Sequence, residues 1–327
     1  MKIISQIILC VALLSFSACS NNKTSTKVSI FETNWFINSE ITNPRSAGEG
    51  LLMNTRMVNV TFEDRNRTDF DSQGNTDEFI AAIPEYVSFG LNAFTLNLQG
   101  GMPGYEGAVN SAFNSDGSLR PEYLNRVERV IRACDRNSAV VILGFYYQRQ
   151  HKILDGEKAI RAGVVNAVQW IQEKGFTNVV VDVANEYGHS GYEGSIIQDP
   201  EGQASLVRLA KETAPELLVS TSGLGNGKID PVVAEACDFL LPHWNGTKVE
   251  DIPARVEVLK QYGKPVVCNE DATDGDEAVA KMLATVNSGA GYGLMLEKVN
   301  QHDPFDFKGA ADDPVYYEAL SKVTGNH

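Results

Sequence analysis

Short apolar runs alternate with segments of helical periodicity along most of the chain. The runs are rich in β-branched residues and only a few residues long, which is typical of buried parallel strands. We expect eight strands, at residues 57–62, 93–98, 140–145, 179–184, 217–220, 239–242, 265–268 and 292–296. Between them, apolar residues recur every three or four positions, which predicts a helix after each strand.

Helix boundaries are marked by capping and breaking residues. Asn75, with Glu78 three residues later, resembles a capping box and predicts the start of the first helix. Gly90 is expected to end that helix, and Pro84 inside it predicts a kink. Pro121 is expected to occupy the first turn of the second helix.

The alternation of eight strands with eight helices limits the possible folds. Parallel strands joined by right-handed crossovers form either an open sheet or a closed barrel. The count of eight favours an α/β fold of the (β/α)8 TIM-barrel type, a single domain over residues 28–327. Before the barrel strands, residues 28–42 contain Trp35-Phe36 and predict a short N-terminal β-hairpin that could close the bottom of the barrel.

The first residues predict a targeting segment. Residues 1–18 have a basic start and an apolar stretch too short to span a bilayer comfortably. Small residues then precede Cys19, as in a bacterial lipobox, so we expect cleavage before Cys19 and lipidation of its thiol. An ordinary signal peptide is the alternative. Residues 19–27 are expected to form a flexible tether. The predicted location is the bacterial cell envelope, with membrane contact only through the lipid.

Composition and charge exclude several functions. The formal charge of −14 disfavours nucleic acid, because binding phosphates requires a basic face. No glycine-rich phosphate loop is present, which disfavours nucleotide cofactors. Cys134, Cys237 and Cys268 lie in predicted helices or strands without metal-ligand spacing, so we expect buried thiols and neither a metal nor another cofactor. The oligomeric state is not predicted.

Polar side chains follow nearly every predicted strand. In a closed barrel the carboxyl ends of the strands meet at one face, where the active sites of such barrels lie. Carboxylates, amides and aromatic rings with few lysines suit a ligand covered with hydroxyl groups, so we expect a carbohydrate. The candidates are Gln99, Tyr146, Tyr147, Asn185, Glu186, His243, Trp244, Glu270 and Glu297.

Two Asn-Glu pairs carry a resemblance to a known family. Asn185-Glu186 follows the fourth expected strand, and Asn269-Glu270 follows the seventh. In this order and spacing, over residues 51–325, the chain resembles the cellulase-like clan of (β/α)8 retaining glycoside hydrolases. Three positions differ from the pattern of that clan. This chain has Tyr187 where the clan usually has proline, His243-Trp244 where it often has another aromatic residue, and Glu297 where many members have tryptophan.

The resemblance implies a reaction and a role for each glutamate. Glu186 would be the general acid/base and Glu270 the nucleophile, cleaving a β-linked, neutral poly- or oligosaccharide by double displacement. Asn185 would bind a hydroxyl group beside the reacting carbon, and His243 and Trp244 would position Glu270 or the sugar. Further substrate contacts are expected from Gln99, Tyr147 and Glu297, and the loops at 102–119 and 188–201 are expected to select the linkage.

Several alternatives remain open from the residues alone. The chain could be a surface glycan-binding protein on a degenerate barrel, or a metal-dependent barrel enzyme such as a sugar isomerase. Tyr146 and Tyr147 cannot both face the site, since neighbours in a strand alternate. Glu297 could instead be an ion-pair partner. His189 is a weaker site candidate, and His151, His302 and His327 are expected on the surface.

Overall fold

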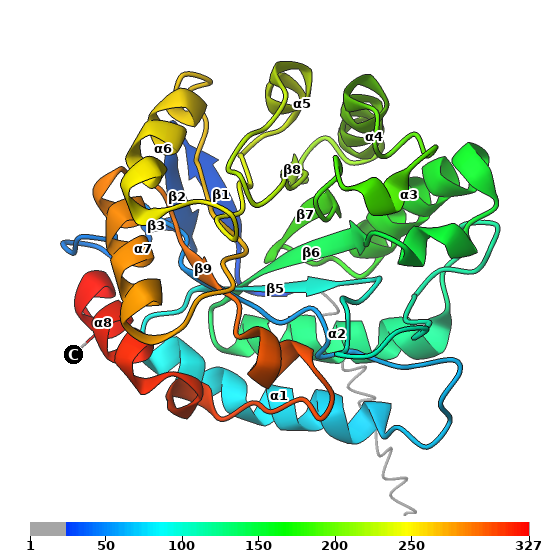
Figure 1. Ribbon diagram of the computed structural model, residues 1–327, viewed down its shortest axis with the longest axis horizontal. Coiled ribbons are helices and arrows are strands. Elements are labelled where there is room, and N and C mark those ends of the chain that lie inside the picture. Colours follow the sequence, from blue (N-terminus) through cyan, green and yellow to red (C-terminus); the bar gives the residue numbers. More distant parts are fainter. Residues whose placement is uncertain (1–23, 327) are drawn as a thin grey trace, which may run out of the picture.

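Strands and helices alternate around a closed barrel in residues 24–326, the part of the chain that the computed structural model describes (Figure 1). The strands are β1 (Val28–Phe31), β2 (Asn34–Ile37), β3 (Glu40–Ile41), β4 (Asn54–Arg56), β5 (Ala93–Asn97), β6 (Val140–Tyr146), β7 (Val179–Ala184), β8 (Val219–Ser220) and β9 (Gly293–Leu294). The α-helices are α1 (Ser72–Ser88), α2 (Pro121–Arg136), α3 (Gly156–Glu173), α4 (Pro200–Thr213), α5 (Pro231–Ala236), α6 (Ile252–Lys260), α7 (Gly275–Asn287) and α8 (Pro314–Thr324).

Six parallel strands form the continuous part of the barrel, in the order β8-β7-β6-β5-β4-β9. The sixth and seventh expected strands are not continuous strands, and single parallel bridges pair them with their neighbours. These bridges join Ser222 to Leu241, Leu240 to Val266, and Val267 to Gly291. They complete the circle from β8 to β9, and the predicted (β/α)8 TIM barrel is confirmed.

The first barrel strand lies earlier than the apolar run predicts. We expected it at residues 57–62, but β4 is Asn54–Arg56 and the following residues form a turn. Polar residues can form this strand because the barrel supplies them with partners: the Asn54 amide donates to the Cys268 carbonyl and the Thr55 hydroxyl to the Leu294 carbonyl. The apolar run is buried by tertiary packing, and its burial does not require a strand.

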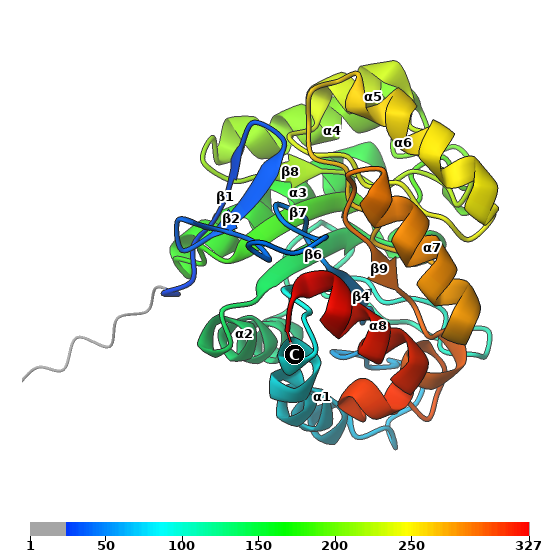
Figure 2. The same cartoon turned by 90° about the vertical axis from the view of Figure 1, so that its left-hand side faces the viewer.

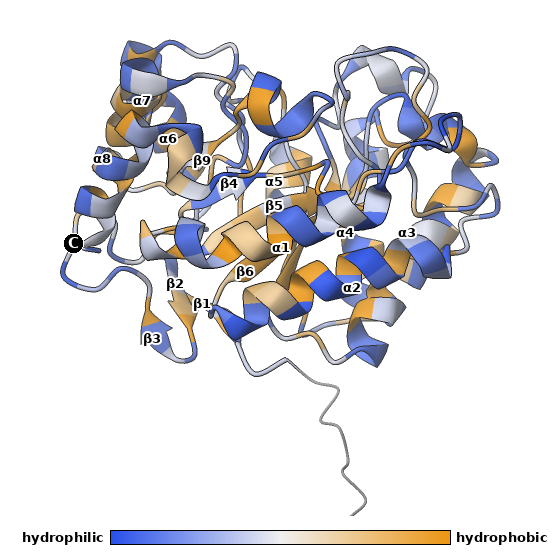
Figure 3. Ribbon diagram, turned by 90° about the horizontal axis from the view of Figure 1, so that it is seen from below, coloured by the Kyte–Doolittle hydropathy of each residue, from blue (hydrophilic) through white to orange (hydrophobic). Residues whose placement is uncertain are grey.

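The N-terminal residues close one end of the barrel. The predicted hairpin is a three-stranded antiparallel sheet, β1-β2-β3, which lies below the barrel strands in Figure 3. The buried ring of Trp35 packs edge-on against Phe239, with ring centroids 5.1 Å apart. Residues 24–27 differ from the expected tether, since Thr24 and Thr26 are buried and bonded to Thr177 and Asp135. The predicted signal segment and Cys19 lie outside the described residues.

The N-cap of helix α1 lies four residues before the predicted cap. This N-cap is Asp71, whose carboxylate accepts the N–H groups of Gln73 and Gly74. Asn75 lies inside the helix, and its amide donates to the carbonyls of Asn59 and Val60. The helix continues through Pro84 to Ser88.

Helices cover the outside of the barrel on all sides (Figures 1 and 2). Figure 3 shows the mostly hydrophobic strands β5 and β6 behind helices whose ribbons alternate between hydrophobic and hydrophilic segments. Cys134, Cys237 and Cys268 are buried and unbridged, as predicted. Among residues 24–326, no helix combines the length and apolar character that crossing a membrane requires.

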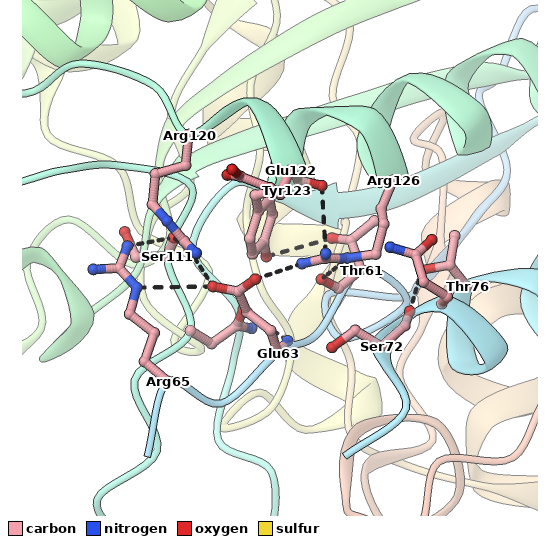
Figure 4. Close-up of polar contacts among 12 residues, drawn as sticks. Thr61, Glu63, Arg65, Ser72, Thr76, Ser111, Arg120, Glu122, Tyr123 and Arg126 are labelled. Atoms are coloured by element: carbon pink, nitrogen blue, oxygen red, sulfur yellow. Dashed lines mark hydrogen bonds and ion pairs between the residues drawn. The ribbon is translucent and has the colours of Figure 1, made fainter. Parts of the chain in front are cut away.

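A cluster of three arginines around Glu63 fixes the loop that follows β4 (Figure 4). The Glu63 carboxylate pairs with Arg120, lies 2.8 Å from Arg126 Nη2 and 3.7 Å from Arg65 Nε. Arg65 and Arg120 also donate to the Ser111 carbonyl in the loop after β5. The cluster therefore ties two loops at the carboxyl end of the barrel to the start of α2.

Candidate active site

The two predicted catalytic glutamates meet at the carboxyl end of the barrel. Glu186 follows β7, and Glu270 follows the seventh barrel strand, where it forms a parallel bridge with His243. An oxygen of each carboxylate and a ring nitrogen of His243 all lie within 4.8 Å of one another. The side chains of Glu186 and Glu270 keep 13% and 7% exposure, so that both are largely buried but open to solvent.

His243 lies between the two carboxylates. Its Nδ1 is 3.4 Å from Glu186 Oε1 and 3.6 Å from Glu270 Oε2, and its side chain is fully buried. The sequence predicted His243 as a sugar-binding or positioning residue. Its burial favours the second role, through direct contact with both carboxylates.

His243 and Glu186 shift each other's protonation. Burial alone would lower the pKa of His243, but the charge of Glu270 and the hydrogen bond and charge of Glu186 outweigh burial and raise it. Burial alone would raise the pKa of Glu186, but its hydrogen bond to His243 and the positive charge there lower it. Without a ligand, the proton of this pair therefore resides mainly on the imidazole.

Arg56 connects Glu270 to Asn185 and was missed by the sequence analysis. It is the last residue of β4, and its side chain is fully buried. Its Nε lies 2.7 Å from Glu270 Oε2, and its Nη2 donates to Asn185 Oδ1 at 2.5 Å. The signal in the sequence was an arginine directly before the apolar run of residues 57–62. Because we predicted the strand at that run, Arg56 fell before the strand and was not considered as its last residue.

Asn185 and Asn245 complete the polar contacts of the site. Asn185 is buried, and its amide nitrogen donates to Gln148 Oε1 at 2.9 Å. Asn245, which the sequence analysis also missed, donates to Glu270 Oε1 at 2.5 Å. Each oxygen of Glu270 thus has its own partner, Arg56 or Asn245, which fixes the plane of the carboxylate.

Tyr147 faces the site and Tyr146 does not. The Tyr146 hydroxyl donates to the Ile160 carbonyl of α3, outside the barrel. Neighbouring residues of a strand alternate in direction, so Tyr147 faces the other side. Burial, and after it the negative charge of Glu270, raises the pKa of Tyr147. Within residues 24–326, no hydrogen bond to the Tyr147 hydroxyl is present, and the residue is 9% exposed.

Trp244 and Gln99 do not have the positions we expected. Trp244 is fully buried, and its indole N–H donates to the Thr285 hydroxyl of α7, so its faces cannot stack on a sugar. Gln99 is also fully buried; it donates to Ser111 and accepts the backbone N–H of Tyr147. Neither side chain is free for the substrate contact that we expected, because Trp244 is packed against α7 and Gln99 is bonded to the neighbouring loops.

The remaining candidates lie at the edge of the site. Glu297 is half exposed, and its Oε1 lies 3.3 Å from Nε2 of the partly exposed His302, which favours the ion-pair alternative. His189 caps a short helix by accepting the N–H of Gly191. His151 was expected on the surface but is buried against Tyr192, with ring centroids 4.8 Å apart.

Two cavities adjoin the residues that follow β6 and β7. One, of about 460 Å³, is lined by Tyr187 and Gly188 next to Glu186, by the loop at 224–231 and by one face of α6. The other, of about 410 Å³, lies between the loops at 102–109 and 149–153. Both volumes lie within the range of about 300–1,000 Å³ that is usual for small-molecule binding sites in proteins.

The acidic residues are a poor metal site. Glu186, His243 and Glu270 offer close ligand atoms, but the Arg56 guanidinium contacts Glu270 directly and would repel a divalent cation. Asp271 is bonded to Lys281 and to the Tyr292 hydroxyl, both at 2.9 Å. The donor set therefore fits proton transfer and nucleophilic attack better than metal binding.

The fold is similar to that of solved glycoside hydrolases. The chain superposes on a GH5-4 broad specificity endoglucanase from Clostridium longisporum with a TM-score of 0.60 and 11% identity, covering 86% of this chain and 99% of that one. For an endo-1,4-beta-mannanase from Eisenia fetida the values are 0.61 and 13%, covering 92% and 96%. For a glycoside hydrolase family 5 enzyme from Prevotella bryantii they are 0.59 and 10%, covering 87% and 98%.

No protein-family model and no curated protein sequence matches this chain. At 10–13% identity, the structural likeness establishes a shared barrel over nearly the whole length of these enzymes. The function has to be argued from the site.

Proposed function

We propose that the protein is a retaining glycoside hydrolase that cleaves a β-linked, neutral poly- or oligosaccharide. The observation that carries this proposal is the approach of Glu186 and Glu270 oxygens to within 4.8 Å. Retaining enzymes hold their carboxyl groups about 5–5.5 Å apart, whereas inverting enzymes need roughly 6.5–9.5 Å to admit a water molecule. The printed functions of the structural neighbours, endoglucanase and endo-1,4-beta-mannanase, support a β-linked backbone as substrate.

In the first step, a Glu270 oxygen attacks the anomeric carbon while Glu186 donates its proton to the glycosidic oxygen. The bond between the anomeric carbon and that oxygen breaks, the leaving sugar departs as an alcohol, and an ester joins the remaining sugar to Glu270. Arg56 and Asn245 hold the Glu270 carboxylate for attack. The Tyr147 hydroxyl can bind the sugar beside the reacting carbon.

In the second step, Glu186 is a carboxylate and acts as a base. It removes a proton from water, whose oxygen attacks the anomeric carbon and displaces Glu270. Both attacks invert the carbon, so the product keeps the β configuration. Glu186 and Glu270 return to their starting states.

Glu186 receives its proton from His243 in this proposal. The active form needs one proton on the pair of Glu186 and His243, whose atoms lie 3.4 Å apart. A pair that can hold this proton at either of two positions releases it at higher pH than either position alone would. The alkaline limb of kcat/KM is therefore set by the pair.

Replacing His243 with asparagine is expected to move the alkaline limb to lower pH. In the wild type we expect this limb above the ordinary imidazole value of 6.5, because the pKa of His243 is raised. His243→Asn leaves only Glu186 to hold the proton, so the limb falls. The measurement is kcat/KM against pH. His302→Asn, which removes a surface histidine from its pair with Glu297, is the control and should keep the wild-type profile.

The proposed function is tested by incubating the purified wild type with a panel of β-glucans, β-mannans and β-xylans. Proton NMR of the first product shows the configuration at the new reducing end. We expect hydrolysis of at least one β-linked polymer with β product first. Release of α product would contradict the retaining mechanism. Binding without cleavage would instead support the glycan-binding alternative.

We also propose that the enzyme is held at the cell envelope through a lipid on Cys19. The support is the apolar segment and the small residues before Cys19 in the sequence. Expression with a labelled fatty acid is expected to label the wild type but not Cys19→Ala. Equal labelling of the two, or none of the wild type, would contradict the anchor.

A further inference from the structure

Glu186 has a backbone conformation that an amino acid with a side chain rarely adopts. Its φ is +49°, in the left-handed region. Such a conformation persists at a functional site only where the surrounding structure holds it. The direction of the Glu186 carboxyl depends on this backbone, so the groups that hold the backbone also aim the carboxyl.

Ser222 contacts the backbone on both sides of the Glu186 α-carbon. It lies two residues beyond the end of β8, the barrel strand beside β7. Its hydroxyl oxygen accepts the N–H of Glu186 at 3.2 Å, and its carbonyl accepts the N–H of Tyr187 at 3.1 Å. These two bonds fix the orientation of the peptide units before and after Glu186.

Asp182 in turn holds Ser222. Its Oδ1 accepts the Ser222 N–H at 2.9 Å, and its Oδ2 accepts the Ser222 hydroxyl at 3.0 Å. A hydroxyl has one proton and two lone pairs, so donation to Asp182 leaves a lone pair for the N–H of Glu186. Asp182 Oδ2 also lies 3.5 Å from the amide of Asn269, the residue before Glu270.

Asp182 lies inside the barrel beneath the two glutamates, and it is fully buried on β7. Burial raises its pKa to about 6, and the charges of Arg56 and His243 and the bonds from Ser222 oppose this rise. Asp182 has no solvent exposure, and its oxygens contact Ser222 and Asn269, so we expect it to act through these neighbours.

We propose that Asp182 and Ser222 are positioning residues that hold the backbone of Glu186 and thereby aim its carboxyl at the glycosidic oxygen. This inference rests on the proposed function, because it assigns a task to Glu186 as the acid. A misplaced acid slows formation of the glycosyl-enzyme only for substrates whose leaving group needs a proton, whereas its effect as a base on the second step is the same for all substrates. A dinitrophenol leaving group departs without one, whereas a sugar alcohol does not.

The test compares Ser222→Ala with Ser220→Ala. Ser220 is a matched control: it is the buried last residue of β8, two residues before Ser222, and its hydroxyl donates to the Phe239 carbonyl, away from Glu186. The substrates are the oligosaccharide that the polymer panel identifies and the dinitrophenyl glycoside of the same sugar. For Ser222→Ala we expect kcat on the oligosaccharide to fall about 10- to 100-fold with little change in KM. The rate constant of the dinitrophenol burst, which measures formation of the glycosyl-enzyme from the dinitrophenyl glycoside, should change less than threefold. Ser220→Ala should keep both rates.

A double-variant cycle tests whether Asp182 acts through Ser222. If it does, Asp182→Asn lowers the same oligosaccharide rate, and the double variant is no slower than the slower single variant. Multiplied losses would overturn the shared path. The positioning role would be overturned if Ser222→Ala lost the same factor in rate on both substrates, or if its rate on the oligosaccharide were unchanged. In both outcomes the wild type hydrolyses both substrates, so the proposed function stands. A wild type that hydrolyses neither substrate would instead overturn the proposed function.

Discussion

Replacement of Glu270 with alanine is expected to lower kcat by roughly 10⁴-fold or more, the scale of loss when a catalytic nucleophile is removed. The variant cannot form the sugar ester, since alanine offers no oxygen to the anomeric carbon. Azide fits the space that the carboxylate leaves, and with an activated β-glycoside it is expected to restore turnover and give the α-glycosyl azide. The measurements are kcat and the configuration of the azide product by NMR.

The control for this variant is Glu173→Ala, at the exposed end of α3. It removes a glutamate of the same size and should keep the wild-type kcat. If Glu270→Ala retained full turnover, Glu270 would not be the nucleophile. An unfolded variant would also be inactive, but azide would not rescue it. Circular dichroism of Glu270→Ala is therefore measured alongside the assay to show that the variant is folded.

Replacement of Glu186 with alanine is expected to have the second largest effect. Hydrolysis of an oligosaccharide should fall about 10²- to 10⁴-fold, because the leaving sugar is no longer protonated. Formation of the sugar ester from a dinitrophenyl glycoside should change far less, since that leaving group needs no proton. The ester then accumulates, because no base activates water, and a burst of dinitrophenol followed by slow turnover is the kinetic signature.

The azide product distinguishes the two glutamates. In Glu186→Ala, azide attacks the sugar ester on Glu270 and gives the β-glycosyl azide, whereas Glu270→Ala gives the α product. An exchange of these configurations between the variants would reverse the assigned roles. If Glu186→Ala showed no burst of dinitrophenol, a role of Glu186 in the second step would be contradicted.

The meeting of Glu186 and Glu270 was predictable because two features of the sequence agree. An apolar run that ends in Asn-Glu places a carboxylate at the end of a buried strand, and the chain contains this arrangement twice, at Glu186 and Glu270. The order of eight strands then places both ends on one face, since all strands of such a barrel are parallel. The prediction needed only the strand order and no side-chain geometry.

The neighbours of the pair were predicted less well. Trp244 and His243 are consecutive residues, but one is packed against α7 and the other lies between the glutamates. Arg56 was overlooked because a hydrophobic pattern favours the apolar run after it as the strand. In each case the deciding quantity is the direction of a side chain. That direction depends on contacts between segments far apart in the sequence, 41 residues for Trp244 with Thr285 and 129 residues for Arg56 with Asn185.

The sequence by itself determined the class of fold, the alternation of strands and helices, and the two carboxylates at the strand ends, because periodicity and composition are local properties. Only the tertiary structure decided which of Tyr146 and Tyr147 faces the site, that Arg56 and Asn245 hold Glu270, and that His243 lies between Glu186 and Glu270. These features arise where separate strands meet at the end of a closed barrel, and their geometry is fixed by distances across the barrel that no local pattern contains.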